Sequence, residues 1–251
     1  MTSILSHSAA ALTGTITVPG DKSISHRSIM LGSIANGVTN ISGFLEGEDS
    51  LATLNAFKDM GVKIEREGSN VVINGVGMNG LKPSLKPLNL GNSGTSIRLM
   101  TGLLSAQIFD STLCGDESLS KRPMARIIDP LSEMGAIIKS SDSKPPLSIS
   151  GNQKLSALKY TLPVASAQIK SCLLLAGLYA DGETCIKENA TTRDHTERML
   201  KGFGYKVTSS SGQVSLTGGG QLQGCDIKIP SDISSASFFI VAASIANNAD
   251  I

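Results

Sequence analysis

Two cations and a serine gather where a helix is predicted to begin near the N-terminus. Lys22, Ser23 and Arg27 lie in the segment 18–28, which runs into an apolar helical pattern that continues to Ala35. Free backbone N–H groups and the positive end of the helix dipole favour an anion at such a position, and the two cations lie close enough to converge on it. The segment indicates a phosphate site, although an ordinary capped helix with solvated basic residues has the same pattern.

Similar helix starts recur three times along the chain. They lie at 92–95, 166–168 and 231–234, and each brings hydroxyl, amide or glycine residues to an apolar helical pattern. Arg122 and Arg193 stand near the second helix of two of these units. If the units surround a pseudo-symmetry axis, several helix dipoles point to one face, and that face attracts anions. Because the formal net charge is only +1, the pattern indicates a small phosphorylated substrate rather than a polymer.

An internal repeat of about 70 residues must position these helix starts. The glycines that end the second helix of each unit are Gly61, Gly135 and Gly204, which lie 74 and 69 residues apart. Each unit is predicted as strand, helix, strand, helix and a strand pair, and the first unit is expected to open with a strand at 15–18. The sequence thus predicts an α/β fold made of pseudo-symmetric units.

We expect three complete units, which form one substrate-binding domain over residues 15–228. Their approximate limits are 15–88, 89–158 and 159–228. A fourth unit begins after them and stops behind its first helix, so 229–251 is expected to be the truncated start of a second domain. This pattern predicts that the chain is the N-terminal portion of a longer protein. The alternative is a terminal helix that docks on the third unit.

Composition argues against several other classes of protein. Tryptophan is absent and aromatic residues make up 4% of the 251 residues, which argues against a nucleic-acid-binding surface. No apolar run approaches the roughly 18 residues needed to span a bilayer, and the start of the chain lacks the features of a targeting signal. The four cysteines form no C-x-x-C pair and the three histidines are widely spaced, so we expect reduced thiols, a cytoplasmic location, no cofactor and no metal site.

Four segments resemble the motifs of the 5-enolpyruvylshikimate-3-phosphate synthase family. They lie at 19–27, 90–95, 121–124 and 192–196, in the family's order, and the variant segment 165–168 resembles its class II branch. The resemblance implies an inside-out α/β barrel domain of three βαβαββ units, with helices inside and sheets outside. It also implies that substrates bind in a cleft between two such domains, and that the N-terminal segment 1–14 belongs with the second domain, which this chain lacks.

The resemblance implies transfer of the enolpyruvyl group of phosphoenolpyruvate to the 5-hydroxyl of shikimate 3-phosphate, with release of phosphate. Lys22 would touch both substrates and act as the catalytic residue. The residues implied for shikimate 3-phosphate are Lys22, Ser23, Arg27, Ser166, Ala167, Gln168 and Arg193. Those implied for phosphoenolpyruvate, where glyphosate also binds in the family, are Lys22, Asn92, Gly94, Thr95, Arg122 and Gln168. Taken singly, each residue also fits a cap, a turn or a surface ion pair.

Two other functions stay open. UDP-N-acetylglucosamine enolpyruvyl transferase shares the architecture, but a Lys-Asn pair in its opening turn and a cysteine in its mobile loop distinguish it. Here the pair is Lys22-Ser23, and Cys114 lies further back than that loop. The second alternative is a non-catalytic phosphosugar-binding module.

The resemblance also sets expectations for the behaviour of the chain. In full-length form we expect a monomer whose partners are its two small substrates, with no nucleic acid and no membrane. The isolated chain is expected to bind shikimate 3-phosphate weakly without turnover, because the family's proposed proton-transfer carboxylates lie in the second half. His26 and His195 are expected to be structural hydrogen-bonding residues.

Overall fold

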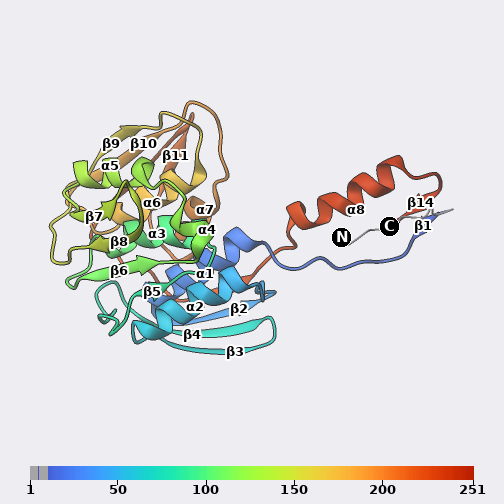
Figure 1. Cartoon of the computed structure of the whole chain (residues 1–251), viewed down its shortest axis with the longest axis horizontal. Coiled ribbons are helices and arrows are strands. Elements are labelled where there is room, and N and C mark those ends of the chain that lie inside the picture. Colours follow the sequence, from blue (N-terminus) through green and yellow to red (C-terminus); the bar gives the residue numbers. More distant parts are fainter. Residues whose placement is uncertain (1–4, 6–10) are drawn as a thin grey trace.

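Three four-stranded sheets surround a group of helices and form the body of the molecule (Figure 1). The computed structural model describes Leu5 and residues 11–251. In each of the three sheets one edge strand runs parallel to its neighbour, and the other neighbouring strands are antiparallel. The repeated pattern confirms the predicted α/β fold.

Each sheet and its helices form one unit of the repeat. The first unit, with strand order β13-β2-β4-β3, consists of α1 (Lys22–Ile34), β2 (Asn36–Ser42), α2 (Glu48–Asp59), β3 (Lys63–Glu67), β4 (Asn70–Val76) and β13 (Asp226–Lys228). The second, with order β5-β6-β8-β7, consists of β5 (Leu88–Asn89), α3 (Gly94–Leu104), β6 (Ser111–Cys114), α4 (Glu117–Ser120), α5 (Ala125–Glu133), β7 (Ile138–Ser141) and β8 (Lys144–Ile149). The third, with order β11-β12-β10-β9, consists of β9 (Lys159–Thr161), α6 (Ala167–Gly177), β10 (Glu183–Lys187), α7 (His195–Gly202), β11 (Thr208–Ser210) and β12 (Gln213–Thr217).

The opening strand of the first unit comes from the far end of the chain, so the strand predicted at 15–18 is wrong. That segment has no regular structure, and β13 takes its place parallel to β2. The amide of Asn40 donates a hydrogen bond of 2.8 Å to the carboxylate of Asp226 beside this pairing. The alternating Thr-Ile-Thr-Val sequence fits a strand locally, but the place beside β2 is occupied by a segment that no local pattern could identify. The domain limits of 15 and 228 stay a proposal.

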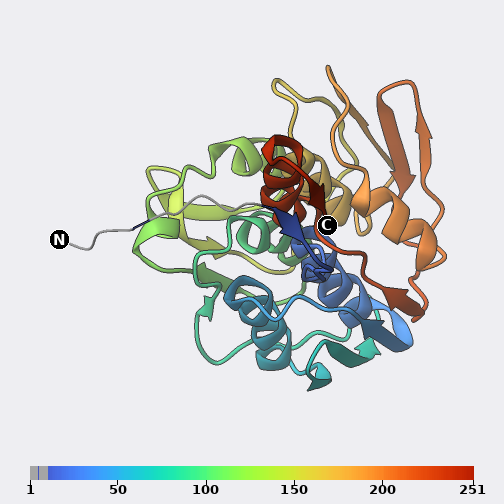
Figure 2. The same ribbon diagram turned by 90° about the vertical axis from the view of Figure 1, so that its right-hand side faces the viewer.

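The first helices of the three units form the interior of the body (Figures 1 and 2). α1, α3 and α6 bury apolar side chains on all sides, as expected for helices enclosed by sheets. α3 and α6 approach closely at Gly102, where a Cβ would lie 2.2 Å from the carbonyl oxygen of Cys172. This close packing brings the N-termini of the interior helices to one end of the body.

The predicted helix ends are confirmed at the second helix of each unit. Gly61, Gly135 and Gly204 follow α2, α5 and α7 with φ angles of +88°, +101° and +79°. Such angles strain residues that carry a Cβ, so glycine ends these helices and turns the chain toward the next strand.

An arm, here defined as residues 11–19 and 231–251, extends from the body (Figure 1). It contains β1 (Leu12–Thr13), α8 (Ile233–Ile245) and β14 (Ala249–Asp250), and β1 pairs with β14. No residue of α8 is buried, and the helix stands apart from the third unit, so the alternative of a terminal helix docked there is wrong. Two hydrogen bonds join the chain segments where the arm meets the body, Asp21 N–H to the Pro230 carbonyl at 2.8 Å and Asp232 N–H to the Pro19 carbonyl at 2.9 Å.

Candidate functional site

A cleft of about 360 Å³ lies where the helix starts of the three units meet. Its lining includes every site residue expected from the sequence except Ser166. The lining residues are Lys22, Ser23, Arg27, Asp49, Asn92, Gly94, Thr95, Arg122, Ala167, Gln168, Arg193 and His195. Side chains that are far apart in the sequence thus share one cavity with four cations.

The interior helices point their N-termini at this cleft, and a polar residue caps each one. Asp21 caps α1 by accepting the Ile24 N–H at 2.8 Å, and Ser93 caps α3 by accepting the Ser96 N–H at 3.1 Å. Ser166 caps α6 beside the cleft. Three helix dipoles therefore favour negative charge in the same cavity. A contact between Ser166 and a ligand stays a proposal.

Lys22 is paired with a carboxylate from the first turn of α2. Its ammonium lies 2.9 Å from the carboxylate of Asp49, and its side chain is 51% exposed toward the cleft. Asp49 lies in the first turn of α2, where Gly47 occupies the cap position and the helix begins at Glu48. Asp49 therefore has its carboxylate free for Lys22, which keeps this flexible cation at the mouth of the cleft.

Arg122 is oriented from the second unit through an amide. Its guanidinium donates to the Asn92 carbonyl oxygen, and the Asn92 amide donates to the carboxylate of Asp116 at 2.9 Å. Asp116 in turn caps the short helix α4 by accepting the Leu119 N–H. This chain of contacts fixes the arginine beside the glycine-containing start of α3.

Arg27 is a buried cation held by hydroxyl groups. Its Nε donates to Thr196 and its Nη2 to Ser171, both at 2.7 Å, while Nη1 donates to the Ser23 carbonyl at 2.9 Å. Burial lowers the pKa of the guanidinium to about 10, and Glu197 is the main carboxylate that opposes this shift. Arg27 therefore stays charged at neutral pH, and it presents a desolvated positive charge to any anion in the cleft.

The two histidines near the cleft differ in their surroundings. His26 is fully buried behind it, where Nδ1 lies 2.8 Å from the Thr53 hydroxyl and 3.1 Å from the Ser96 hydroxyl. Desolvation lowers its pKa to about 3, so the ring is neutral at physiological pH. His195 lines the cleft, and desolvation lowers its pKa as well. His26 thus connects three helices by hydrogen bonds, whereas His195 can reach a ligand.

Gln168 bridges the second and third units. Its Oε1 accepts from Arg98 at 2.6 Å, and its Nε2 donates to the Thr95 hydroxyl at 3.1 Å. Sequence reasoning missed Arg98, three residues after the motif segment 90–95, and Asp49, which lies outside the motif segments, and it gave His195, within the segment 192–196, only a structural role. Burial lowers the pKa of the Arg98 guanidinium, with Arg122 as the first of the neighbouring cations that add to the shift. The two hydrogen bonds of Gln168 hold its side chain in place where it lines the cleft.

A family model described as EPSP synthase (3-phosphoshikimate 1-carboxyvinyltransferase) matches residues 7–251. The chain belongs to the EPSP synthase family. It is 69% identical over 241 residues to the 3-phosphoshikimate 1-carboxyvinyltransferase of Ruthia magnifica, a match that covers 96% of this chain and 55% of that protein. The corresponding protein of Vesicomyosocius okutanii is 65% identical over 251 residues, which cover all of this chain and 58% of that protein.

Solved EPSP synthase structures have the same fold. The EPSP synthase of Acinetobacter baumannii superimposes with a TM-score of 0.89 at 59% identity, over 95% of this chain and 54% of that one. The chain thus spans little more than half the length of the curated relatives and solved structures that it matches. This likeness confirms the family and the fold expected from the four motif segments.

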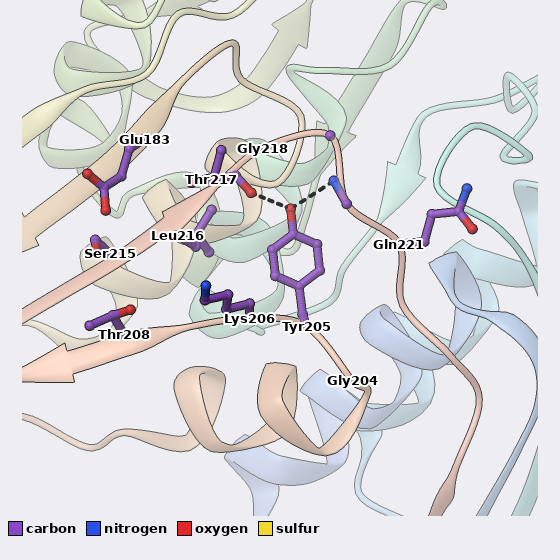
Figure 3. A pocket seen from close by; sticks show the side chains of 12 residues that line it. Glu183, Gly204, Tyr205, Lys206, Thr208, Ser215, Leu216, Thr217, Gly218 and Gln221 are labelled. Atoms are coloured by element: carbon purple, nitrogen blue, oxygen red, sulfur yellow. Dashed lines mark hydrogen bonds between the residues drawn. The ribbon is translucent and has the colours of Figure 1, made fainter.

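A second pocket in this EPSP synthase-family chain lies on the third unit and lacks the anion-binding character of the cleft (Figure 3). It has a volume of about 440 Å³ and surrounds Tyr205, whose hydroxyl donates to the Thr217 carbonyl at 2.7 Å and accepts from the Gly220 N–H at 3.2 Å. Lys206 is the one cation among the residues that line it, and Glu183 offsets that charge. Size alone therefore does not identify the functional site.

Two kinds of feature are absent from the described residues, a cluster of metal ligands and a helix that could span a membrane. Among those residues, no group of three or more His, Cys, Asp or Glu side chains could hold a metal ion. No helix within residues 11–251 is long and apolar enough to cross a membrane.

Proposed function

We propose that this chain forms the shikimate 3-phosphate half of an enzyme that transfers the enolpyruvyl group of phosphoenolpyruvate to the 5-hydroxyl of shikimate 3-phosphate. The reaction gives 5-enolpyruvylshikimate 3-phosphate and phosphate. The whole protein acts in the cytoplasm as a monomer, without metal or cofactor. The relatives are named 3-phosphoshikimate 1-carboxyvinyltransferase, which supports this proposal.

The observation that carries the proposal is the convergence of Lys22, Arg27, Arg122 and Arg193 with three capped helix starts in one cleft. Both substrates carry phosphate and phosphoenolpyruvate adds a carboxylate. Without counter-charges, two such anions would repel one another strongly at ~4 Å in a cavity with little water. Hydrogen bonds hold Arg27 and Arg122 in place, so these two charges are supplied with little reorganisation of the protein.

The cleft has one side for each substrate in this proposal. Shikimate 3-phosphate lies against α1 and α6, where Ser23, Arg27 and Gln168 meet Arg193 from the loop before α7. Ser166 and Ala167 complete that side at the start of α6. Phosphoenolpyruvate lies against the start of α3, and its contacts are Asn92, Gly94, Thr95, Arg122 and Gln168. The hydrogen bond between Gln168 and Thr95 keeps the two sides in register.

Lys22 acts on both substrates in this proposal. Its ammonium carries three protons, of which the Asp49 carboxylate accepts one at 2.9 Å. The remaining donors face the cleft, where they stabilise the negative charge that develops as the enolpyruvyl group is transferred. Asp49 keeps the lysine oriented, so removal of either side chain is expected to slow the reaction more than it weakens binding.

Two assays separate this proposal from its alternatives. Calorimetry with shikimate 3-phosphate is expected to show weak binding to the chain alone, and a turnover assay on the same sample is expected to show no product. The chain completed with the part of the Ruthia magnifica relative that follows the matched segment is expected to turn over. A completed protein that binds shikimate 3-phosphate without turnover would favour a non-catalytic module, and transfer to UDP-N-acetylglucosamine instead would favour the sister transferase.

A further inference from the structure

A buried cluster of three charges lies behind the wall of the cleft. The ammonium of Lys170, near the N-terminus of the apolar helix α6, lies 2.8 Å from Glu188 and 2.7 Å from Glu197. The lysine side chain is 1% exposed, and the two glutamates are 9% and 6% exposed. None of these residues lines the cleft, so the cluster does not touch a ligand there.

The cluster holds the loop that carries Arg193. Glu188 follows β10, and its second carboxylate oxygen accepts a hydrogen bond from the hydroxyl of Thr192. Its backbone N–H donates to the Gly212 carbonyl at 2.7 Å, and the side chain of Asn189 donates to the Leu162 carbonyl at 2.9 Å. The loop 188–194 is therefore fixed from the back at Glu188 and Thr192, one residue before Arg193.

The same cluster joins the two helices that hold Arg27. Ser171 follows Lys170 on α6, and Thr196 precedes Glu197 on α7. The two hydroxyls lie 2.7 Å from one another, and each accepts a hydrogen bond from Arg27. The ion pair between Lys170 and Glu197 thus lies directly beside the hydroxyl pair, and it keeps α6 and α7 at the separation that Arg27 needs.

Stability alone gives a weak reason for a lysine in this position. Removing two or three charges from water costs several kcal/mol per ion, and apolar residues of similar volume often stabilise a core at least as well. Most of the other α6 side chains are apolar, so a leucine or methionine would match the composition of the helix. A buried lysine between two carboxylates does provide what an apolar side chain cannot, a directional link between three separate segments.

We propose that Lys170 is a positioning residue of the anion site, which acts through Glu188 and Thr192 to hold Arg193 against the ligand. The proposal rests on the proposed function only for the identity of that ligand. Loss of the link is expected to loosen the loop 188–194 in the free chain and to weaken an anion that Arg193 binds.

Amide hydrogen exchange on the ligand-free chain tests the link without any ligand. Thr192→Val removes the hydroxyl and keeps the branched shape and both ion pairs of Lys170, so the fold is expected to be retained. Exchange in 189–194 is expected to become ~10-fold faster, because a local opening there loses one of its few constraints. Thr191→Val is the matched control, since Thr191 is the exposed neighbour and its exchange is expected to match the parent. Unchanged exchange in Thr192→Val would overturn the proposal.

Lys170→Met tests the lysine itself. The methionine fills a similar volume but leaves two carboxylates without a cation, so exchange is expected to increase both in 189–194 and at the start of α7. Lys170→Met/Glu197→Gln restores the parental net charge of the cluster but still lacks the ion pair between Lys170 and Glu188. The loop 188–194 is therefore expected to stay mobile in that variant. If the double variant regains parental exchange in 189–194, charge balance rather than positioning explains the lysine and the proposal fails.

Calorimetry with shikimate 3-phosphate connects the loop to Arg193. Thr192→Val and Arg193→Ala are each expected to weaken binding, and the double variant is expected to bind no more weakly than Arg193→Ala alone, because Thr192 acts through the arginine. Fully additive losses would overturn the proposal. If the parent chain does not bind shikimate 3-phosphate, the proposed function fails, while the exchange measurements still decide whether the lysine holds the loop.

Discussion

The starts of α6 and α8 have similar chemistry but different surroundings. Ser166 caps the first and Asp232 caps the second, and both helices are strongly apolar. α6 is enclosed by the sheets and directs its N-terminus into a cleft with four cations, whereas α8 lies in the arm with every side chain at least partly exposed. A capped helix start can therefore serve an anion only where other elements bring cations and further helix starts to the same place.

Loss of Arg27 is expected to have the largest effect on the cleft. Arg27→Ala removes a buried cation with three hydrogen bonds, and binding of shikimate 3-phosphate is expected to weaken by roughly 2 to 5 kcal/mol. Calorimetry measures the loss. Arg66→Ala removes a surface arginine that pairs with Glu46 on the first unit, and its affinity is expected to equal that of the parent. An unchanged affinity in Arg27→Ala would place the anion outside the cleft.

Acid is expected to destabilise the body through His26. The folded pKa of about 3 lies below the usual value of 6.5, so the unfolded chain takes up the proton first, and the free energy of unfolding decreases as the pH falls below about 6.5. At pH 5 the loss is about 2 kcal/mol, since one pKa unit corresponds to ~1.4 kcal/mol.

Thermal unfolding at pH 7 and pH 5 measures this dependence on pH. His26→Gln retains hydrogen-bonding groups but has no imidazole that can take up a proton. Most of the difference in stability between pH 7 and pH 5 is therefore expected to disappear. The residual slope comes from groups such as His195, whose pKa is also lowered. A slope equal to that of the parent would show that His26 is not the group that titrates.

Gly94→Ala is expected to change ligand preference at the start of α3. The added methyl would lie 2.8 Å from an Nη atom of Arg122 and 3.3 Å from one of Arg98, so these guanidinium groups must move. Glyphosate is expected to compete with phosphoenolpyruvate in the completed protein. The variant is expected to raise the inhibition constant for glyphosate by about tenfold, which lies within the overpacking cost of about 1–3 kcal/mol. The Michaelis constant for phosphoenolpyruvate is expected to rise much less. Inhibition curves that superimpose for the parent and variant would contradict this steric account.

Removal of helix caps gives the smallest effects and tests the comparison directly. Ser93→Ala deletes the cap of α3 within the body, and the free energy of unfolding is expected to fall by about 1 kcal/mol. Asp232→Ala deletes the cap of α8 and is expected to leave unfolding of the body unchanged. Urea unfolding followed by tyrosine fluorescence reports on the body, since Tyr160, Tyr179 and Tyr205 all lie there. An equal loss in both variants would show that the arm and body unfold as one unit.

The sequence predicted the features that depend on neighbouring residues. Capping side chains and helix-ending glycines act within one turn of the chain, so Asp21, Gly61 and Gly135 could be recognised from their own segments. The repeat and the resemblance then indicated which helix starts meet. The cleft contains those residues because each unit repeats a capped helix start, and the three helices share one interior.

Features that depend on distant partners could not be predicted in this way. The segment 15–18 has the alternation of a strand, but pairing with β2 is decided by competition with β13. Lys170 stands in an apolar helix, and its carboxylate partners come from the loop and helix that follow β10. Asp49 fits a helix cap by type, and only the packing of α2 against α1 reveals its ion pair with Lys22.

The origin of β13 has a consequence for the order in which the molecule assembles during synthesis. The second and third units take all of their sheet strands from one continuous stretch each, so each can form as soon as that stretch has left the ribosome. The first unit, although made first, keeps the edge of β2 open until residues 226–228 arrive, across a sequence separation of 186 at the contact of Asn40 with Asp226. Of the three units, the one synthesised first is thus the last to complete its sheet. Until then the unpaired edge of β2 is exposed to non-native strand pairing.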